Sequence, residues 1–82
     1  MRLDKFLKVS RIVKRRPVAN ELCSTGTVQI NGKVAKASST VKVGDVIQLQ
    51  FGNREIIARI LEVPEKTPPA HLANSLYQTL SN

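Results

Sequence analysis

The sequence predicts an α+β domain in which two short helices precede a small, mostly antiparallel sheet. Apolar residues recur about every 3.6 positions up to Gly26 and about every second position after it, and these spacings are typical of helices and strands respectively. Pro17 indicates a helix start, and Asn31-Gly32 indicates a tight hairpin turn. With 82 residues, of which 41% are hydrophobic, the chain is long enough for one small domain.

The first segment is predicted to be an amphipathic helix. One face of it carries a stripe of Leu3, Phe6, Leu7, Ser10 and Val13, all apolar except Ser10. An acid near the start, Asp4, suits the positive end of the helix dipole. Because proline disfavours a helical conformation at the residue before it, we expect this helix to end around residues 10–14.

The second helix reads PVANELCS and has Arg16 at its entrance. Its buried side is expected to be Val18, Ala19, Leu22 and Cys23. Gly26 is a natural terminator, since glycine readily adopts the left-handed conformation that follows many helices. The two helices therefore meet at a tight corner that carries three consecutive cations, residues 14–16.

The region after Gly26 alternates as strands do. We expect strands at residues 27–30, around 33–34, at 46–51 and at 54–63, with turns at Asn31-Gly32, Gly44-Asp45 and Gly52-Asn53. Residues 35–40 are predicted to form a loop that crosses the sheet.

A proline-rich stretch, PEKTPP, follows Pro64 and is predicted to be an extended linker. Residues 69–80 carry apolar side chains at helical spacing, which predicts a short C-terminal helix. Such a helix is marginal alone in water, so it either packs on the domain or becomes ordered on a partner. The predicted division is a domain of residues 1–63 and a linker with a helix at 64–82.

Positive charge is concentrated in residues 1–16. This segment holds seven cations and one acid, whereas residues 17–82 are nearly neutral, with six basic and five acidic side chains. A concentrated patch of this kind indicates a polyanionic partner, above all phosphate. A merely solvated helix face and an acidic lipid surface are the alternatives. No apolar run approaches the roughly 18 residues of a membrane span, and the basic start lacks the apolar segment of a signal peptide.

The corner between the helices is the sharpest candidate for a phosphate site. Free backbone N–H groups at the second helix start favour an anion, and Arg15 and Arg16 add forked donors that match phosphate oxygens. Lys33 and Lys36 could extend the patch from the sheet side, or could serve only the solubility of the hairpin. Aromatic residues are absent from the sequence of this patch, which favours binding to the backbone of structured RNA over single strands.

Catalysis and cofactor binding are not indicated. His71 has no acid near it in sequence, and Cys23 occupies a predicted core position. One cysteine and one histidine cannot supply a four-ligand zinc site or a disulfide, and no phosphate-cradling glycine loop is present. The sequence therefore predicts a binding protein that is not an enzyme, needs no cofactor and suits a reducing cytoplasm.

Several motifs resemble the S4-type RNA-binding domain. They are RLDKFL, the SR pair, Arg16 with Ala19, G-x-V-x-I-N-G from Gly26, and V-x-V-G-D-x-I from Val41. They occur in the family's order over about residues 2–51. The resemblance implies the alpha-L fold, a helix pair packed on a strongly bent sheet. Asn20 departs from a basic residue common in the family, and Ala37 departs from a frequent proline.

A nearly free-standing copy of this module resembles the small ribosome-associated heat-shock proteins and their RqcP branch. That resemblance implies binding to rRNA of the split large ribosomal subunit and to peptidyl-tRNA, in support of an RqcH-type factor that adds an alanine tail. We expect a cytoplasmic monomer without membrane contact. A ribosome-assembly factor on precursor rRNA and a basic protein-interaction adaptor remain alternatives.

The candidate RNA-binding residues come from two arguments. The resemblance implies Arg2, Arg11 and Arg16, and the charge pattern adds Lys5, Arg15, Lys33 and Lys36.

Overall fold

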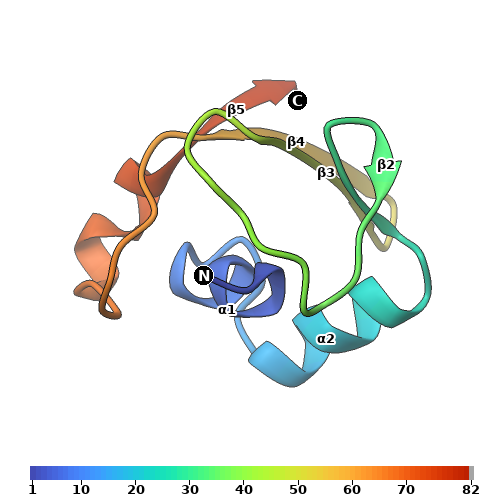
Figure 1. The fold of residues 1–82 in the computed structure, drawn as a ribbon, viewed down its shortest axis with the longest axis horizontal. Coiled ribbons are helices and arrows are strands. Elements are labelled where there is room, and N and C mark those ends of the chain that lie inside the picture. The colour runs from blue at the N-terminus through green and yellow to red at the C-terminus, as the bar shows by residue number, and fades with distance from the viewer. Residues whose placement is uncertain (82) are drawn as a thin grey trace.

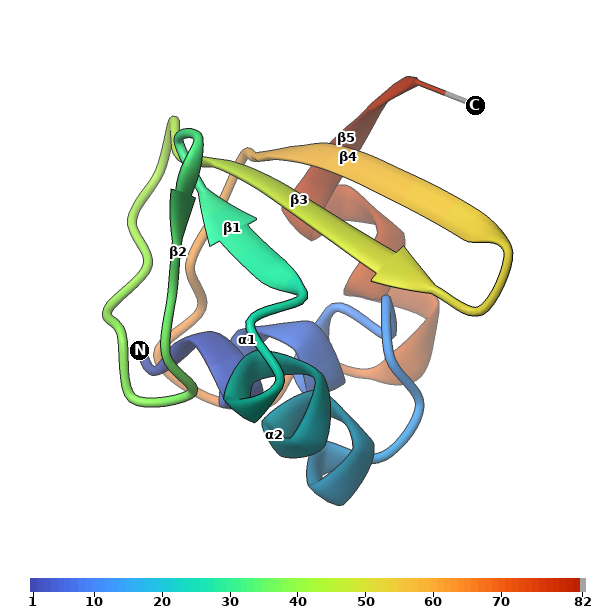
Figure 2. The same cartoon turned by 90° about the vertical axis from the view of Figure 1, so that its right-hand side faces the viewer.

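Two helices lie against one five-stranded antiparallel sheet in the computed structural model, which describes residues 1–81. The helices are α1 (Leu3–Val9) and α2 (Arg16–Ser24), and the strands are β1 (Val28–Ile30), β2 (Lys33–Val34), β3 (Val46–Phe51), β4 (Arg54–Ile60) and β5 (Tyr77–Ser81). The spatial order of the strands is β2-β1-β3-β4-β5. Figure 1 shows the sheet arching over α1, and Figure 2 shows both helices on the same side of the sheet.

The apolar stripe predicted for the first helix is confirmed. Leu3, Phe6 and Leu7 are fully buried, and Ser10 and Val13 continue the buried stripe beyond the helix. The helix ends at Val9, slightly before the predicted range. The reason is local, because Arg11 adopts a left-handed backbone with φ of 61° and its N–H donates to the carbonyl of Lys8 at 3.0 Å.

The second helix begins and ends where the sequence indicates. Pro17 lies in its first turn, and the chain leaves it through Gly26, whose φ of 76° only glycine adopts without strain. Ala19 and Cys23 are buried as predicted, whereas Val18 and Leu22 are half-buried against the core. Burial raises the pKa of the Cys23 thiol, and the nearby charge of Asp4 raises it further, so the thiol stays neutral in the core.

Two turns that are distant in sequence are clamped together beside β1 and β3. The side-chain amide of Asn31 donates to Asp45 Oδ1 at 3.1 Å, and its carbonyl oxygen accepts the backbone N–H of Val46 at 3.0 Å. Asp45 Oδ2 also accepts the backbone N–H of Lys42 at 3.0 Å. The predicted hairpin turn is confirmed, with positive φ at Asn31 and Gly32. The two glycine-containing motifs of the sequence therefore meet in one hydrogen-bonded cluster.

The C-terminal region differs in part from the predicted helix. A 3₁₀ helix, η1 (Ala70–Leu76), covers the first half of it, and its Ala73 and Leu76 are buried. The prediction is wrong for residues 77–80, which lie in β5 (Tyr77–Ser81) and pair with β4. A short helix has little stability of its own, whereas the free edge of β4 offers backbone hydrogen-bonding partners that a strand can satisfy.

The predicted last strand is also too long, because β4 ends at Ile60 and not at Val63. The carbonyl of Leu76 accepts the N–H groups of Leu61 and Glu62 at 2.8 and 3.2 Å. The chain after Pro64 thus folds back onto the sheet. The division into residues 1–63 and 64–82 stays a prediction.

Replacing Asp45 with alanine is expected to lower the free energy of unfolding by about 2 kcal/mol, because it leaves the Asn31 amide and the Lys42 N–H without their acceptor. Urea unfolding measures the change. The exposed Glu65→Ala is a matched control, expected to stay within about 0.5 kcal/mol of the parent. Equal stability of both variants would contradict the clamp.

Candidate nucleic-acid interface

A buried carboxylate lies where the starts of α1 and α2 meet, here called the helix joint. Asp4 is only 2% exposed, and its oxygens accept four groups. Oδ1 accepts the backbone N–H of Lys5 at 2.8 Å and Nε of Arg2 at 3.2 Å. Oδ2 accepts Nε of Arg16, Nδ2 of Asn20 and Nη2 of Arg2, all at 3.4 Å. One side chain of α1 therefore fixes the start of both helices.

The two arginines on Asp4 stay available to a partner. Their side chains are 52% exposed for Arg2 and 47% exposed for Arg16, so part of each guanidinium faces solvent. One carboxylate between two guanidinium groups leaves the cluster with a net positive charge. The pairing therefore orients the two cations and does not neutralise them.

The groups around Asp4 keep its carboxyl ionised. Burial alone would raise the pKa of Asp4, but the hydrogen bond from Asn20, the charge of Arg16 and the backbone N–H of Lys5 outweigh it and hold the pKa below its ordinary value. The carboxylate is therefore charged under all physiological conditions. From the sequence alone, Asp4 is assigned only to the positive end of the helix dipole. Its position three residues before Leu7 places it beside the buried stripe, which is the one local sign that it is buried.

The loop that precedes β3 closes over the start of α1. The N–H of Leu3 donates to the carbonyl of Ser39 at 2.7 Å, and the N–H of Asp4 donates to the carbonyl of Ala37 at 3.2 Å. These contacts satisfy N–H groups that a helix start leaves free. They also bring Lys36 beside Arg2, and both residues line a hollow of about 420 Å³ between α2 and this loop. We call the exposed cations Arg2, Arg16 and Lys36 the joint face.

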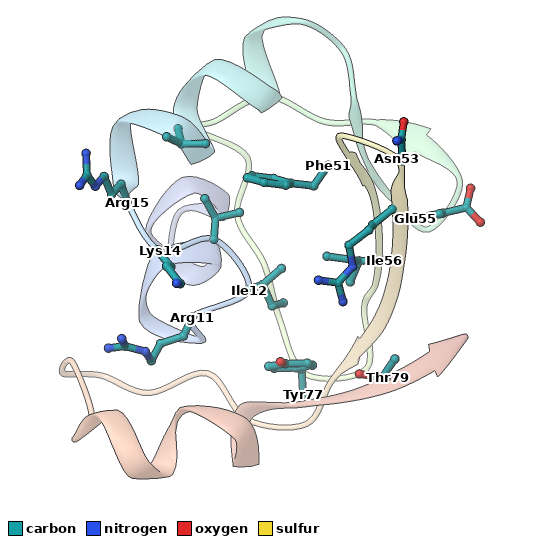
Figure 3. Close-up of a pocket in the computed structure, with 13 residues that line it drawn as sticks. Arg11, Ile12, Lys14, Arg15, Phe51, Asn53, Glu55, Ile56, Tyr77 and Thr79 are labelled. Atoms are coloured by element: carbon teal, nitrogen blue, oxygen red, sulfur yellow. The ribbon is translucent and has the colours of Figure 1, made fainter. Parts of the chain in front are cut away.

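The other predicted site residues are not all on this face. Arg11 and Arg15 line a separate groove of about 950 Å³, together with Lys14. Figure 3 shows these three cations on the helix-corner side of the groove. Lys33 is exposed at the start of β2 and lines neither hollow, and Lys5 is half-buried in α1.

Two aromatic rings lie in this groove, which corrects the expectation that the basic patch has none. Phe51 comes from the end of β3 and Tyr77 from the start of β5, and Arg54 of β4 also lines the groove. Figure 3 shows Ile12 between the two rings. No local sequence pattern predicts that these two rings meet, because β3 and β5 are brought to the helix corner only by the fold of the sheet that β5 completes.

The amino-acid sequence of this chain has close relatives. Residues 1–47 match the model of the S4 domain family. Over 81 residues the chain is 43% identical to the RQC P-site tRNA stabilizing factor of Streptococcus pneumoniae, covering 99% of this chain and 91% of that protein. Over 74 residues it is 47% identical to the protein of the same name from Bacillus subtilis, covering 90% and 86% of the two chains.

The fold has a close structural neighbour as well. Heat shock protein 15 of Vibrio cholerae, whose structure is described as trimeric, shares 33% identity with this chain at a TM-score of 0.89, covering 99% of this chain and 82% of its own. Within residues 1–81, every helix is too short or too polar to cross a bilayer.

Replacing Asp4 with asparagine is expected to flatten the acid limb of the stability profile. Because the pKa of Asp4 is lower in the folded state, its charge stabilises the fold above about pH 4. This stabilisation is lost as the pH falls through the folded-state pKa. Urea unfolding between about pH 2 and pH 7 checks this, with the exposed Glu65→Gln as control. An Asp4→Asn profile parallel to that of the parent would contradict the assignment.

Proposed function

Because the chain belongs to the S4 domain family, we propose that it binds structured RNA on the large ribosomal subunit as a factor of ribosome quality control. The joint face is the observation that carries this proposal. It holds two half-exposed guanidinium groups in a fixed relation through the buried Asp4, and guanidinium forks match phosphate oxygens. Relatives that align with nearly the whole chain are named RQC P-site tRNA stabilizing factors.

The RNA partners in this proposal are rRNA of a split large subunit and the peptidyl-tRNA that it retains. The protein acts in the cytoplasm by holding the tRNA in position while an RqcH-type factor extends the nascent chain with alanine. It contributes binding and orientation, and no chemical step of its own. The charge pattern supports binding to RNA, since seven of the chain's 13 lysines and arginines lie in residues 1–16.

The positions of Arg2 and Arg16 at the helix starts support an interface that is ordered before RNA binds. Arg2 immediately precedes α1 and Arg16 is the first residue of α2, so both cations are anchored to secondary structure as well as to Asp4. An interface ordered in advance loses less conformational entropy on binding. We propose the monomer as the binding unit.

Arg16→Ala is expected to weaken binding to large subunits that carry peptidyl-tRNA by about tenfold or more, since a hydrogen bond to a charged group contributes about 1.5–3 kcal/mol. Stability should fall by about 1 kcal/mol or less, because the ion pair is half-exposed. Co-sedimentation measures the binding, and Lys66→Ala in the linker removes the same charge as a control. Equal losses for both variants would contradict a site at the joint face.

The same assay separates the competing functions. Binding to precursor subunits alone would identify an assembly factor, and binding that survives ribonuclease would identify a protein adaptor.

Asp4→Asn tests whether orientation or total charge governs binding. The variant gains a unit of positive charge, which by electrostatics alone would tighten RNA binding. If Asp4 orients Arg2 and Arg16, affinity should instead fall several-fold despite the higher charge. Fluorescence anisotropy with an rRNA hairpin at fixed salt measures it, and Glu65→Gln supplies the same change in charge elsewhere. Tighter binding by both variants would rule out the orienting role.

A further inference from the structure

The groove lined by Phe51 and Tyr77, here called the Phe51 groove, is separate from the joint face. No residue that lines it also lines the hollow beside Arg2 within residues 1–81. Three segments distant in sequence build it: the connection between α1 and α2 with the first turn of α2, the β3–β4 hairpin, and β5. The groove therefore exists only because the tail completes the sheet.

The lining of the Phe51 groove combines aromatic, aliphatic and cationic groups. Its apolar part consists of Ile12, Val13, Val18, Phe51, Ile56 and Tyr77, and its cations are Arg11, Lys14, Arg15 and Arg54. Glu55 is the one carboxylate among the lining residues of residues 1–81, and its Oε2 accepts Nε2 of Gln48 at 3.2 Å. Phe51 is 43% exposed, so a ligand could reach its ring.

We propose that the Phe51 groove binds an unpaired nucleotide of RNA. The base stacks on the exposed ring of Phe51, and the adjoining phosphates lie on the surrounding cations. The inference rests on the proposed RNA-binding function and names a second part of the RNA that the protein contacts. Aromatic rings beside cations are the usual means of binding unpaired nucleotides, because every base has a face that stacks and every linkage has a charge.

The size and the charge of the groove favour a nucleotide over a protein segment. Its volume of about 950 Å³ is at the upper end of the range of small-ligand sites, which leaves room for a base with its sugar and phosphates. A protein segment would need several carboxylates interspersed with apolar side chains to match the four cations. A nucleotide carries the flat ring and the anion in a single unit.

The backbone of Arg11 adds an independent observation. Its φ of 61° places it in the left-handed region, at the position after a helix where glycine is preferred. Non-glycine residues persist there at an energetic cost, and such outliers cluster at ligand sites. An arginine side chain does not stabilise this turn. Its position on the groove therefore accounts for an arginine where glycine would be less strained.

The test measures binding of a six-nucleotide single-stranded RNA with 2-aminopurine at its third position, against the same RNA lacking that base. The parent protein should bind the complete RNA about fivefold or more tightly than the abasic one, because base stacking on an aromatic residue contributes on this scale. Phe51→Leu keeps an apolar side chain without an aromatic face and should lose this preference. Leu72→Ala, an exposed apolar residue of η1 outside the groove, should retain it.

A parent protein without preference between the two RNAs, or a Phe51→Leu variant that keeps the preference, would overturn the proposal. A photo-crosslinking amino acid at position 51 should react with RNA in the complex with large subunits, and crosslinks to protein alone would also overturn it. The proposed function fails separately, if the parent protein does not associate with large subunits at all. Thermal unfolding verifies that each variant is folded.

Arg11→Gly tests the cationic side of the groove. Glycine suits the left-handed backbone, so the thermal midpoint should stay equal or rise. Affinity for the complete and the abasic RNA should fall by the same factor, and the log–log salt slope should become shallower by about 0.7, as for one lost contact to single-stranded phosphate. Unchanged affinity would overturn the assignment of phosphates to this side.

Discussion

The buried carboxylate of Asp4 is the contact on which the arrangement of the helix joint depends. A charge this deeply buried is costly unless charged and hydrogen-bonding groups surround it, and Asp4 has both arginines, an amide and a backbone N–H around it. If any one of these partners is removed, fewer groups remain to stabilise the buried negative charge. The start of α1 and the start of α2 are therefore held in one geometry, and the joint face inherits that geometry.

Positions that depend on local chemistry could be predicted from the sequence, and positions that depend on tertiary pairing could not. The stripe through Leu3 and Phe6 and the turn at Asn31-Gly32 follow from spacing and backbone preference, and both are as predicted. The strand at Tyr77–Ser81 was missed, because its apolar spacing also fits a helix and only the free edge of β4 decides between them. Local sequence also cannot divide the predicted cations between surfaces: Arg11 and Arg15 line one hollow, whereas Arg2 and Lys36 line another.

The cations of residues 1–16 do not form one patch, because they are divided between the joint face and the Phe51 groove. Seven cations in sixteen residues repel one another, and a single patch would concentrate this repulsion. The fold distributes them around the corner, so that consecutive residues Arg15 and Arg16 contribute to different surfaces. In the proposed binding mode, an RNA that contacts both the joint face and the Phe51 groove meets cations on each of the two surfaces.

The choice of arginine at the joint follows from the same geometry. Arg16 uses only its Nε to reach Asp4, which leaves its terminal nitrogens for a phosphate. A guanidinium has five N–H donors in a fixed plane, so it can hold a carboxylate on one side and a phosphate on another without changing rotamer. A lysine ammonium is a single point of charge on a flexible chain, and its contact with Asp4 would occupy the group that the phosphate needs. Arginine thus lets one side chain serve the fold and the interface together, and the buried acid that orients it makes the exposed donors effective.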